Sequence, residues 1–102
     1  MFWWGPESSY NEEKGLYIRY GYCDDQDEGD DWTFTYSFDL QNSKRFVELI
    51  GTGKNPEDVE EYIQKYLDNR MALEKFCEKN EIHGKRTDVG EYPAAHYGPY
   101  EF

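Results

Sequence analysis

The residues from 23 to 31 hold the densest charge in the chain, because six of these nine positions are carboxylic acids. Closely spaced carboxylates can bind a hard cation, act as general acids and bases, or attract a basic partner. Like charges at this density repel one another, so a fold that keeps them on one short connection loses stability there. A basic or cationic partner is the simplest explanation for them. The six residues are Asp24, Asp25, Asp27, Glu28, Asp30 and Asp31.

An EF-hand calcium loop is one arrangement that this acidic run resembles in composition but not in spacing. Counting from Asp24 puts Gly29 at the sixth position, as such a loop requires, but puts Thr35 at the twelfth, where a glutamate is needed. Zinc is also disfavoured, because no two of the cysteines and histidines stand at the close spacing of a zinc site. We therefore predict no metal and no cofactor.

Catalysis by a thiol would require a cysteine that a nearby base activates. Cys23 stands beside Asp24 and Asp25, whose charges disfavour a thiolate, and Cys77 falls on the apolar side of a predicted helix. No motif places two carboxylates around a cleft, and no glycine-rich phosphate loop is present. The sequence predicts a protein that is not an enzyme. A centre built on Cys23 or His96 is the alternative from the enzyme class.

The charge balance limits the kinds of partner. The 102 residues carry a net charge of −11, and residues 1–40 contain ten acids against only Lys14 and Arg19. Direct binding to DNA, RNA or an anionic membrane is disfavoured, because phosphate contacts need clustered Lys and Arg. The apolar stretch at residues 1–6 is too short for a signal peptide or a membrane span, which predicts a cytoplasmic protein.

The aromatic content of 19% favours a folded chain, and its length suits a single domain over residues 1–102. Two segments with apolar and polar residues in alternation flank the acidic run. They predict an antiparallel β-hairpin with strands at about 15–22 and 32–40. The expected buried faces are Leu16, Ile18, Tyr20 and Tyr22 on the first strand and Trp32, Phe34, Tyr36, Phe38 and Leu40 on the second.

The remaining elements must cover the apolar face of this hairpin. Helical spacing predicts a short helix at about 43–50, capped by Asn42 or Ser43, and a long helix at about 56–80, which begins at Asn55 and Pro56. The glycines, prolines and aromatic residues of the last twenty positions predict an ordered but irregular arm. The class is α+β. The sheet order stays open, because each terminus could add an edge strand.

These features predict a small acidic binding protein, without enzymatic activity, that inhibits a basic and nucleic-acid-binding partner as a nucleic-acid mimic. Acidic side chains would steer the encounter, and aromatic contacts would slow dissociation. Beyond the acidic run, the predicted partner-binding residues are Glu57, Asp58, Glu60 and Glu61 on the long helix and the exposed tyrosines Tyr17, Tyr97 and Tyr100.

Two known groups of proteins are similar to the chain in composition. One is the small acidic phage inhibitors of host defence, of the anti-CRISPR or anti-restriction type, and the other is the small acidic immunity proteins that neutralise cationic toxin nucleases. No motif links the chain to either group. A third hypothesis is a structural or assembly subunit whose exposed aromatic residues form a homodimer face. The sequence leaves open the identity of the partner and the choice between monomer and homodimer.

Overall fold

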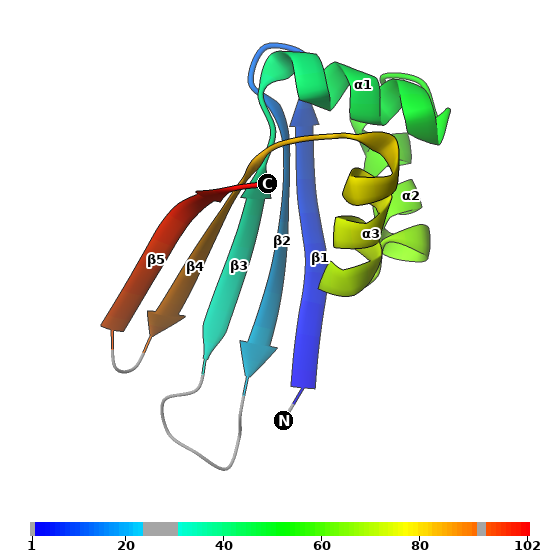
Figure 1. Ribbon diagram of the computed structural model, residues 1–102. Helices are drawn as coiled ribbons and strands as arrows, with labels where there is room; N and C mark the ends of the chain where they lie inside the picture. Colours follow the sequence, from blue (N-terminus) through cyan, green and yellow to red (C-terminus); the bar gives the residue numbers. More distant parts are fainter. Residues whose placement is uncertain (1, 24–30, 92–93) are drawn as a thin grey trace.

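The computed structural model describes residues 2–23, 31–91 and 94–102, and its central feature is a five-stranded antiparallel sheet (Figure 1). The strands lie in the order of the sequence, and three helices are inserted between β3 and β4. The predicted α+β class is confirmed. The strands are β1 (Phe2–Asn11), β2 (Gly15–Cys23), β3 (Trp32–Ser37), β4 (Lys85–Glu91) and β5 (Ala94–Glu101). The helices are α1 (Leu40–Ile50), α2 (Pro56–Tyr66) and α3 (Arg70–Asn80).

The hairpin of β2 and β3 follows from the alternation on either side of the acidic run. Tyr22 pairs with Trp32 and Ile18 pairs with Tyr36 in the antiparallel ladder. Directly opposite residues point to the same side of a sheet, so the large side chains of both strands share one face. The predicted antiparallel pairing is confirmed, and β2 covers the predicted 15–22 with one residue more.

The boundary between β3 and α1 differs from the prediction. The strand predicted over 32–40 is three residues shorter, and α1 begins at Leu40. The cause is Asp39, whose carboxylate accepts a hydrogen bond from the Asn42 backbone N–H at 2.8 Å and caps the helix. The predicted caps, Asn42 and Ser43, were wrong. Leu40, expected on the buried strand face, is exposed at the start of the helix.

The single helix predicted over 56–80 was also wrong, because the chain forms α2 and α3 with a break between them. The side chain of Asn69 accepts a hydrogen bond from the Ala72 backbone N–H at 2.9 Å and starts α3. The Leu67 carbonyl, at the end of α2, accepts a hydrogen bond from the Tyr20 hydroxyl at 2.6 Å. The break resets the helix phase, so that both apolar faces can pack on the sheet.

The start of α2 was predicted correctly, since the Asn55 side chain accepts a hydrogen bond from the Glu57 backbone N–H at 2.9 Å and Pro56 follows the cap. Two apolar residues within the predicted long helix are not core residues. Tyr66 and Met71 are exposed, because they lie beside the break rather than on the faces that meet the sheet.

Residues 83–102, predicted as an irregular arm, mainly form β4 and β5. The alternation was hidden because Arg86 and Asp88 take the helix-side positions of β4 opposite the aromatic residues of β3. Each terminus adds an edge strand, the two places that the sequence left open. Both edge strands contain a Gly-Pro pair at an irregularity in the ladder, at residues 5–6 and 98–99. Such irregularities limit pairing with another edge strand.

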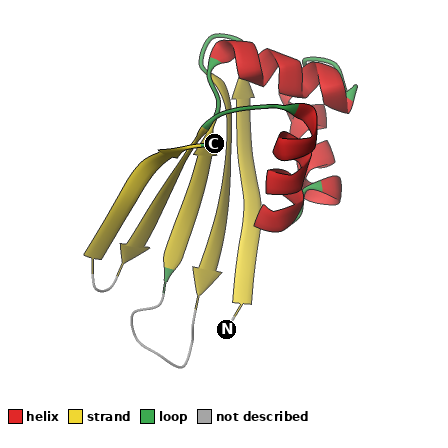
Figure 2. Ribbon diagram, in the orientation of Figure 1, coloured by secondary structure: helices red, strands yellow, loops and turns green. Residues whose placement is uncertain are grey.

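The three helices lie on one face of the sheet and gather over its β1 and β2 side (Figure 2). The Ser43 hydroxyl joins the layers, because it accepts a hydrogen bond from the Leu16 backbone N–H at 2.8 Å and donates one to the Phe38 carbonyl at 3.1 Å. No helix in the described part of the chain is long and apolar enough to cross a membrane. The buried apolar residues are Tyr10, Leu16, Ile18, Tyr20, Tyr36, Phe38, Phe46, Val47, Ile50, Val59, Ile63, Leu67, Leu73, Cys77 and Ile82.

Candidate partner-binding surface

The helix-side face of the sheet continues beyond the helices as a series of aromatic side chains. We call these residues the aromatic row: Trp3, Tyr22, Phe34, Trp32 and Tyr97. Trp3 on β1 pairs with Tyr22 on β2, which pairs with Trp32 on β3, so the row crosses the sheet near the end where the chain leaves β2 and enters β3. Trp3 is 57% exposed and Tyr97 is 51% exposed. Tyr22, Trp32 and Phe34 are half-buried, and Phe34 packs against the core. The row therefore begins at the border of the core and ends in exposed rings.

Ring contacts hold the aromatic row in place. Trp32 stacks on Phe34 with 6.4 Å between ring centroids and on Tyr97 with 5.9 Å. Trp3 contacts Tyr22 at 5.0 Å and Phe34 at 6.0 Å. A Cβ atom added to residue 90 of β4 would lie 3.2 Å from the Trp32 ring, so the glycine there lets the ring lie close to the backbone. Contacts of this kind preorganise a surface and reduce the entropy lost on binding.

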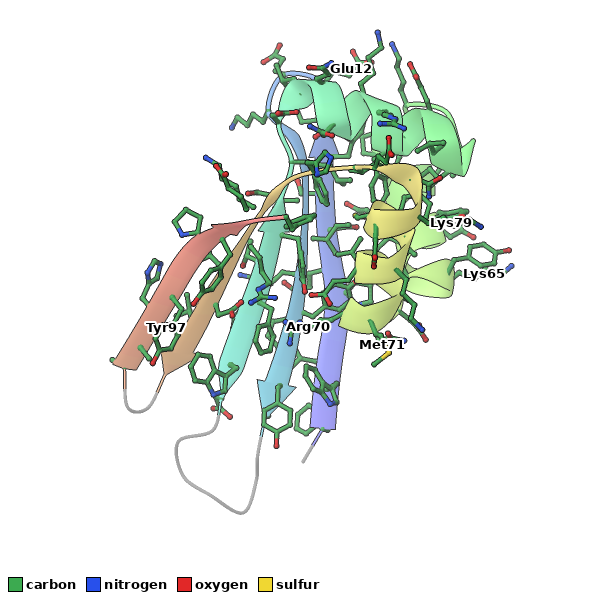
Figure 3. The ribbon with its side chains drawn as sticks, in the orientation of Figure 1. Glu12, Lys65, Arg70, Met71, Lys79 and Tyr97 are labelled. Carbon is green, nitrogen blue, oxygen red and sulfur yellow. The ribbon has the colours of Figure 1, made fainter. Side chains whose placement is uncertain are left out.

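Among the described helices, α3 reaches the aromatic row with its first turn. The Arg70 guanidinium lies 3.7 Å from the centre of the Phe34 ring. Figure 3 shows Arg70 between α3 and the central strands, and Tyr97 over β5. Met71 is 65% exposed beside a hollow of about 440 Å³ that Trp3 and Arg70 also line. The surface thus combines flat rings, a flexible thioether and a guanidinium, which are side chains common in protein interfaces.

A polar network separates the aromatic row from the core. The Tyr36 hydroxyl donates a hydrogen bond to Glu74 Oε1 at 2.6 Å and accepts one from Arg70 Nε at 3.0 Å. Arg86 Nη1 lies 3.6 Å from the same carboxylate oxygen, and Arg86 Nε lies 3.1 Å from Asp88 Oδ1 in an ion pair without hydrogen-bond alignment. Burial, with the hydrogen bond to Glu74, raises the pKa of Tyr36 to about 12. The network fixes α3 against β3 and β4.

A larger cleft of about 560 Å³ lies on the other side of this network, between α3 and the strands β3 to β5, and we call it the α3 cleft. Glu74 and Arg86 line both this cleft and the smaller hollow beside Met71, so these two side chains form the boundary between the two cavities. The apolar lining of the α3 cleft includes Tyr36, Tyr100 and Phe102. The aromatic row and the α3 cleft therefore form one continuous side of the molecule.

The predicted acidic residues that the structure describes do not form a single patch. Residues 24–30 lie outside the described residues, and Asp31 is half-buried just before β3. The predicted acids of α2 follow Lys54, whose ammonium lies 3.4 Å from Glu12 in the turn between β1 and β2. That turn precedes β2 and the acidic connection follows it. The nine extended residues of β2 span roughly 26 Å between its two ends. The α2 acids are Glu57, Asp58, Glu60 and Glu61, of which Glu60 is half-buried and the others are exposed.

The three predicted contact tyrosines are all exposed, but the structure does not bring them together. Tyr97 is part of the aromatic row, and Tyr100 lines the α3 cleft. Tyr17 lies on the opposite face of the sheet, opposite Ser37 in the ladder, and shares that face with Arg19. Sequence alternation could separate Tyr17 from the buried residues of β2, but it could not place it relative to β5.

The thiol and imidazole of the enzyme alternative are held apart. Cys23 ends β2 and His96 lies on β5, so β3 and β4 separate them. Three strand spacings correspond to roughly 14 Å between the two backbones. Cys77 is buried, as predicted, and burial raises the pKa of its thiol to about 12. The sheet does not pair these groups into a nucleophile and its base.

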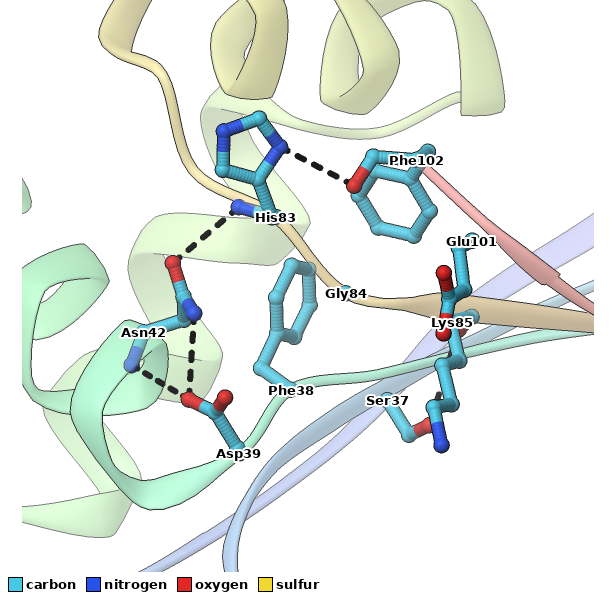
Figure 4. A pocket seen from close by; sticks show the side chains of 9 residues that line it. All are labelled: Ser37, Phe38, Asp39, Asn42, His83, Gly84, Lys85, Glu101 and Phe102. Carbon is cyan, nitrogen blue, oxygen red and sulfur yellow. Dashed lines mark hydrogen bonds between the residues drawn. The ribbon is translucent and has the colours of Figure 1, made fainter.

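A further hollow of about 550 Å³ at the end of β3 has mixed walls, in which polar side chains lie beside the rings of Phe38 and Phe102 (Figure 4). Asp39 Oδ1 accepts hydrogen bonds from the backbone N–H and the side-chain amide of Asn42, at 2.8 Å and 3.1 Å. Asn42 Oδ1 in turn accepts one from the His83 backbone N–H at 3.1 Å, and His83 Nδ1 lies 3.1 Å from the Phe102 carbonyl oxygen. These bonds fix the start of α1 against the connection to β4, so the polar groups serve the fold.

The sequence interpretation missed several residues of this surface. Trp3 was noted only as part of an apolar N-terminal stretch, although a tryptophan pair at the start of a possible edge strand was a usable signal. No sequence pattern predicts the contacts among Arg70, Glu74 and Arg86, because these contacts depend on the break between α2 and α3 and on the formation of β4. Comparison with protein-family models, curated proteins and solved structures finds no match to the chain. The aromatic row and the charges around it are therefore the features of the molecule that point to a function.

Proposed function

We propose that the protein is a cytoplasmic, acidic binding protein that captures a basic partner and blocks the surface with which that partner contacts nucleic acid. One observation carries the proposal. β2 ends at Cys23 and β3 begins at Trp32, so the connection with six carboxylates joins the sheet next to two members of the aromatic row, Tyr22 and Trp32. The connection that contains the carboxylates thus joins the sheet at the end where the aromatic rings lie, so attraction of a basic partner and contact with it would occur at the same end.

Each part has a distinct physical role in this proposal. The carboxylates take the place of nucleic-acid phosphates, and their field attracts a cationic surface and accelerates association. The aromatic row then excludes water from the contact, and its large, ordered rings slow dissociation. Because Trp3 and Tyr97 are already half-exposed and held by ring contacts, little order has to be created on binding.

Two classes of partner fit this chemistry. One is a nucleic-acid-binding effector of a defence system, which a phage inhibitor of the anti-CRISPR or anti-restriction type would block. The other is a cationic toxin nuclease, which an immunity protein would neutralise. Both have basic surfaces that contact phosphates, so the same experiment identifies either of them.

The test compares three tagged proteins as bait in a cell lysate. The first is the wild type, and the second has the six acids of residues 24–31 changed to Asn or Gln. The third is a control with the same change in net charge at Glu13, Glu48, Glu57, Asp58, Glu60 and Glu61. The sequence predicted the four acids of α2 as contacts, but α2 begins near the turn between β1 and β2, away from the acidic connection, so the proposal gives them no contact. Captured proteins are eluted with a salt gradient and, separately, with excess nucleic acid.

The expected result is a basic, nucleic-acid-binding protein that the wild type and the control retain and that nucleic acid displaces. Neutralising the acidic connection should lower its association rate more than tenfold at low salt, because steering depends on nearby charge. Equal losses for the second and third proteins would attribute capture to net charge alone and contradict the proposal. Self-association of all three, measured by sedimentation, would instead support the homodimer hypothesis.

A further inference from the structure

The α3 cleft has the dimensions and the charge of a pocket for one side chain of a partner. Its volume of about 560 Å³ falls within the range of small-ligand pockets. The apolar lining comes from three elements: Cys77 on α3, Ile82 in the connection that follows it, and the rings of Tyr36, Tyr100 and Phe102 on the sheet side. Such a lining suits an aliphatic stem or a flat group.

Carboxylates dominate the polar part of this cleft. Glu74, Glu78, Glu81 and Glu101 line it, whereas Arg86 is the one arginine or lysine and His83 the one histidine among the described residues of its lining. Glu74 is already paired with Arg70 and Arg86. Glu101 lies opposite Lys85 in the β4–β5 ladder, so its side chain points to the face of the sheet away from Arg86 and Tyr100. Within the described ranges, Glu78 and Glu81 have no ion-pair partner, so an entering cation would meet these two carboxylates.

The spacing of these carboxylates argues against a metal ion. Within the part of the chain that the structure describes, no three His, Cys, Asp or Glu side chains converge closely enough to hold one. Carboxylates spread around an aromatic pocket instead suit a long side chain, whose stem lies on rings while its charged end has several hydrogen-bond donors. Arg86 shows this arrangement within the protein, since its guanidinium lies 5.1 Å from the centre of the Tyr100 ring.

We propose that the α3 cleft binds a lysine or arginine side chain of the basic partner. The inference rests on the proposed function and adds the chemistry of recognition to it. The stem of the partner's side chain lies against Phe102 and Ile82, and its cation lies between Glu78 and Glu81. The aromatic row then gives the broad contact, and the cleft selects a partner with a basic side chain at one position.

The test uses small probes and no partner protein. N-acetyl-arginine amide and N-acetyl-lysine amide are titrated into ¹⁵N-labelled protein, and N-acetyl-citrulline amide serves as the neutral match of the arginine probe. We expect saturable shifts at the amides of Ile82, His83 and Phe102 with both cationic probes and none with citrulline. The Kd should rise at least tenfold in a variant with Glu78 and Glu81 changed to Gln.

A matched variant with Glu13 and Glu48 changed to Gln has the same net charge and should bind the probes as the wild type does. All four substitutions are at exposed positions, so both variants should keep the fold, which circular dichroism verifies. Shifts spread over every acidic surface, equal binding of citrulline, equal losses in both variants, or no saturable shift would each overturn the proposal.

Failure here is distinct from failure of the proposed function. If the probes do not bind but the lysate experiment yields a nucleic-acid-displaceable partner, the binding function stands and the α3 cleft is not its specificity pocket. If the probes bind as expected but no basic partner is captured, the cleft is a site for cationic side chains and the nucleic-acid-blocking function is wrong.

Discussion

Two halves of one sheet face carry the same kinds of large side chain but differ in what covers them. Over β1 and β2, the helices bury Ile18 and Tyr20, and Leu73 of α3 packs in the same covered half; none of the three is more than 2% exposed. Toward the acidic connection and β5, the aromatic row is only partly covered, and half of Trp3 and of Tyr97 is in contact with solvent. Period-two alternation determines which face is apolar, whereas the placement of the helices determines which part of that face becomes core.

The comparison predicts that the two halves contribute unequally to stability. Removing a buried side chain costs the lost transfer free energy and leaves a cavity, whereas an exposed side chain costs little. The aromatic row would then persist for a reason other than folding. The predictions below test that division on α3, on the protonation of buried groups and on the row itself.

The largest effect is expected on α3, which has a residue of each kind two positions apart. Leu73→Ala should lower the free energy of unfolding by about 2–5 kcal/mol, because Leu73 is fully buried in the covered half. Met71→Ala, beside the aromatic row, should change it by no more than about 0.5 kcal/mol. Urea unfolding followed by circular dichroism measures both. Similar losses for the two variants would show that the row is part of the core.

Much of the fold could be predicted from the sequence where one local rule applied. The hairpin of β2 and β3 followed from alternation, and the start of α2 followed from Asn55 and Pro56. The errors occurred where two rules competed. Asp39 continued the alternation of a strand but capped a helix, and Asn69 fell within a helical apolar pattern but started a new helix. In each case a short polar side chain accepts a hydrogen bond from a backbone N–H and starts a helix. The periodic pattern of apolar residues does not reveal such a helix start.

Less of the candidate site could be predicted, because it depends on contacts between distant segments. The exposed tyrosines were identified, yet Tyr17 lies on the other face from Tyr97 and Tyr100. The network of Arg70, Glu74 and Arg86 joins α3 to β4, a strand that the sequence did not predict. Charged residues on the inner face of a strand conceal its period, so neither the strand nor the cleft beside it had a signal.

The second effect is a loss of stability at alkaline pH that originates in the covered half. Burial raises the pKa of the Cys77 thiol to about 12, and burial with the hydrogen bond to Glu74 raises the pKa of Tyr36 to about 12. In the unfolded chain these groups lose protons near about 8.5 and 10. Above those values the unfolded state binds fewer protons, so the free energy of unfolding should fall by roughly 1.4 kcal/mol per pH unit for each group.

Urea unfolding at a series of pH values from about 7 to 11 measures this slope, and the stabilising contribution should be complete below about pH 8.5. Cys77→Ala is the control, because it removes the thiol and changes little volume. Its slope between about pH 8.5 and 10 should be smaller than that of the wild type. The steeper loss above pH 10 should remain, because Tyr36 is unchanged and burial also raises the pKa of Tyr20. Identical slopes would show that Cys77 is accessible to water in the folded protein.

The smallest effect on stability is expected in the aromatic row, where Tyr97 is the member on the edge strand. Its ring stacks on Trp32 but is half in solvent, so Tyr97→Ser should lower the free energy of unfolding by no more than about 1 kcal/mol. Tyr97→Phe keeps the ring and should match the wild type in stability and in near-ultraviolet circular dichroism. A loss well above 2 kcal/mol for the serine variant would mean that folding explains the row. A small loss leaves a set of ordered rings at the surface with little role in folding, which is the condition under which binding to a partner explains their presence.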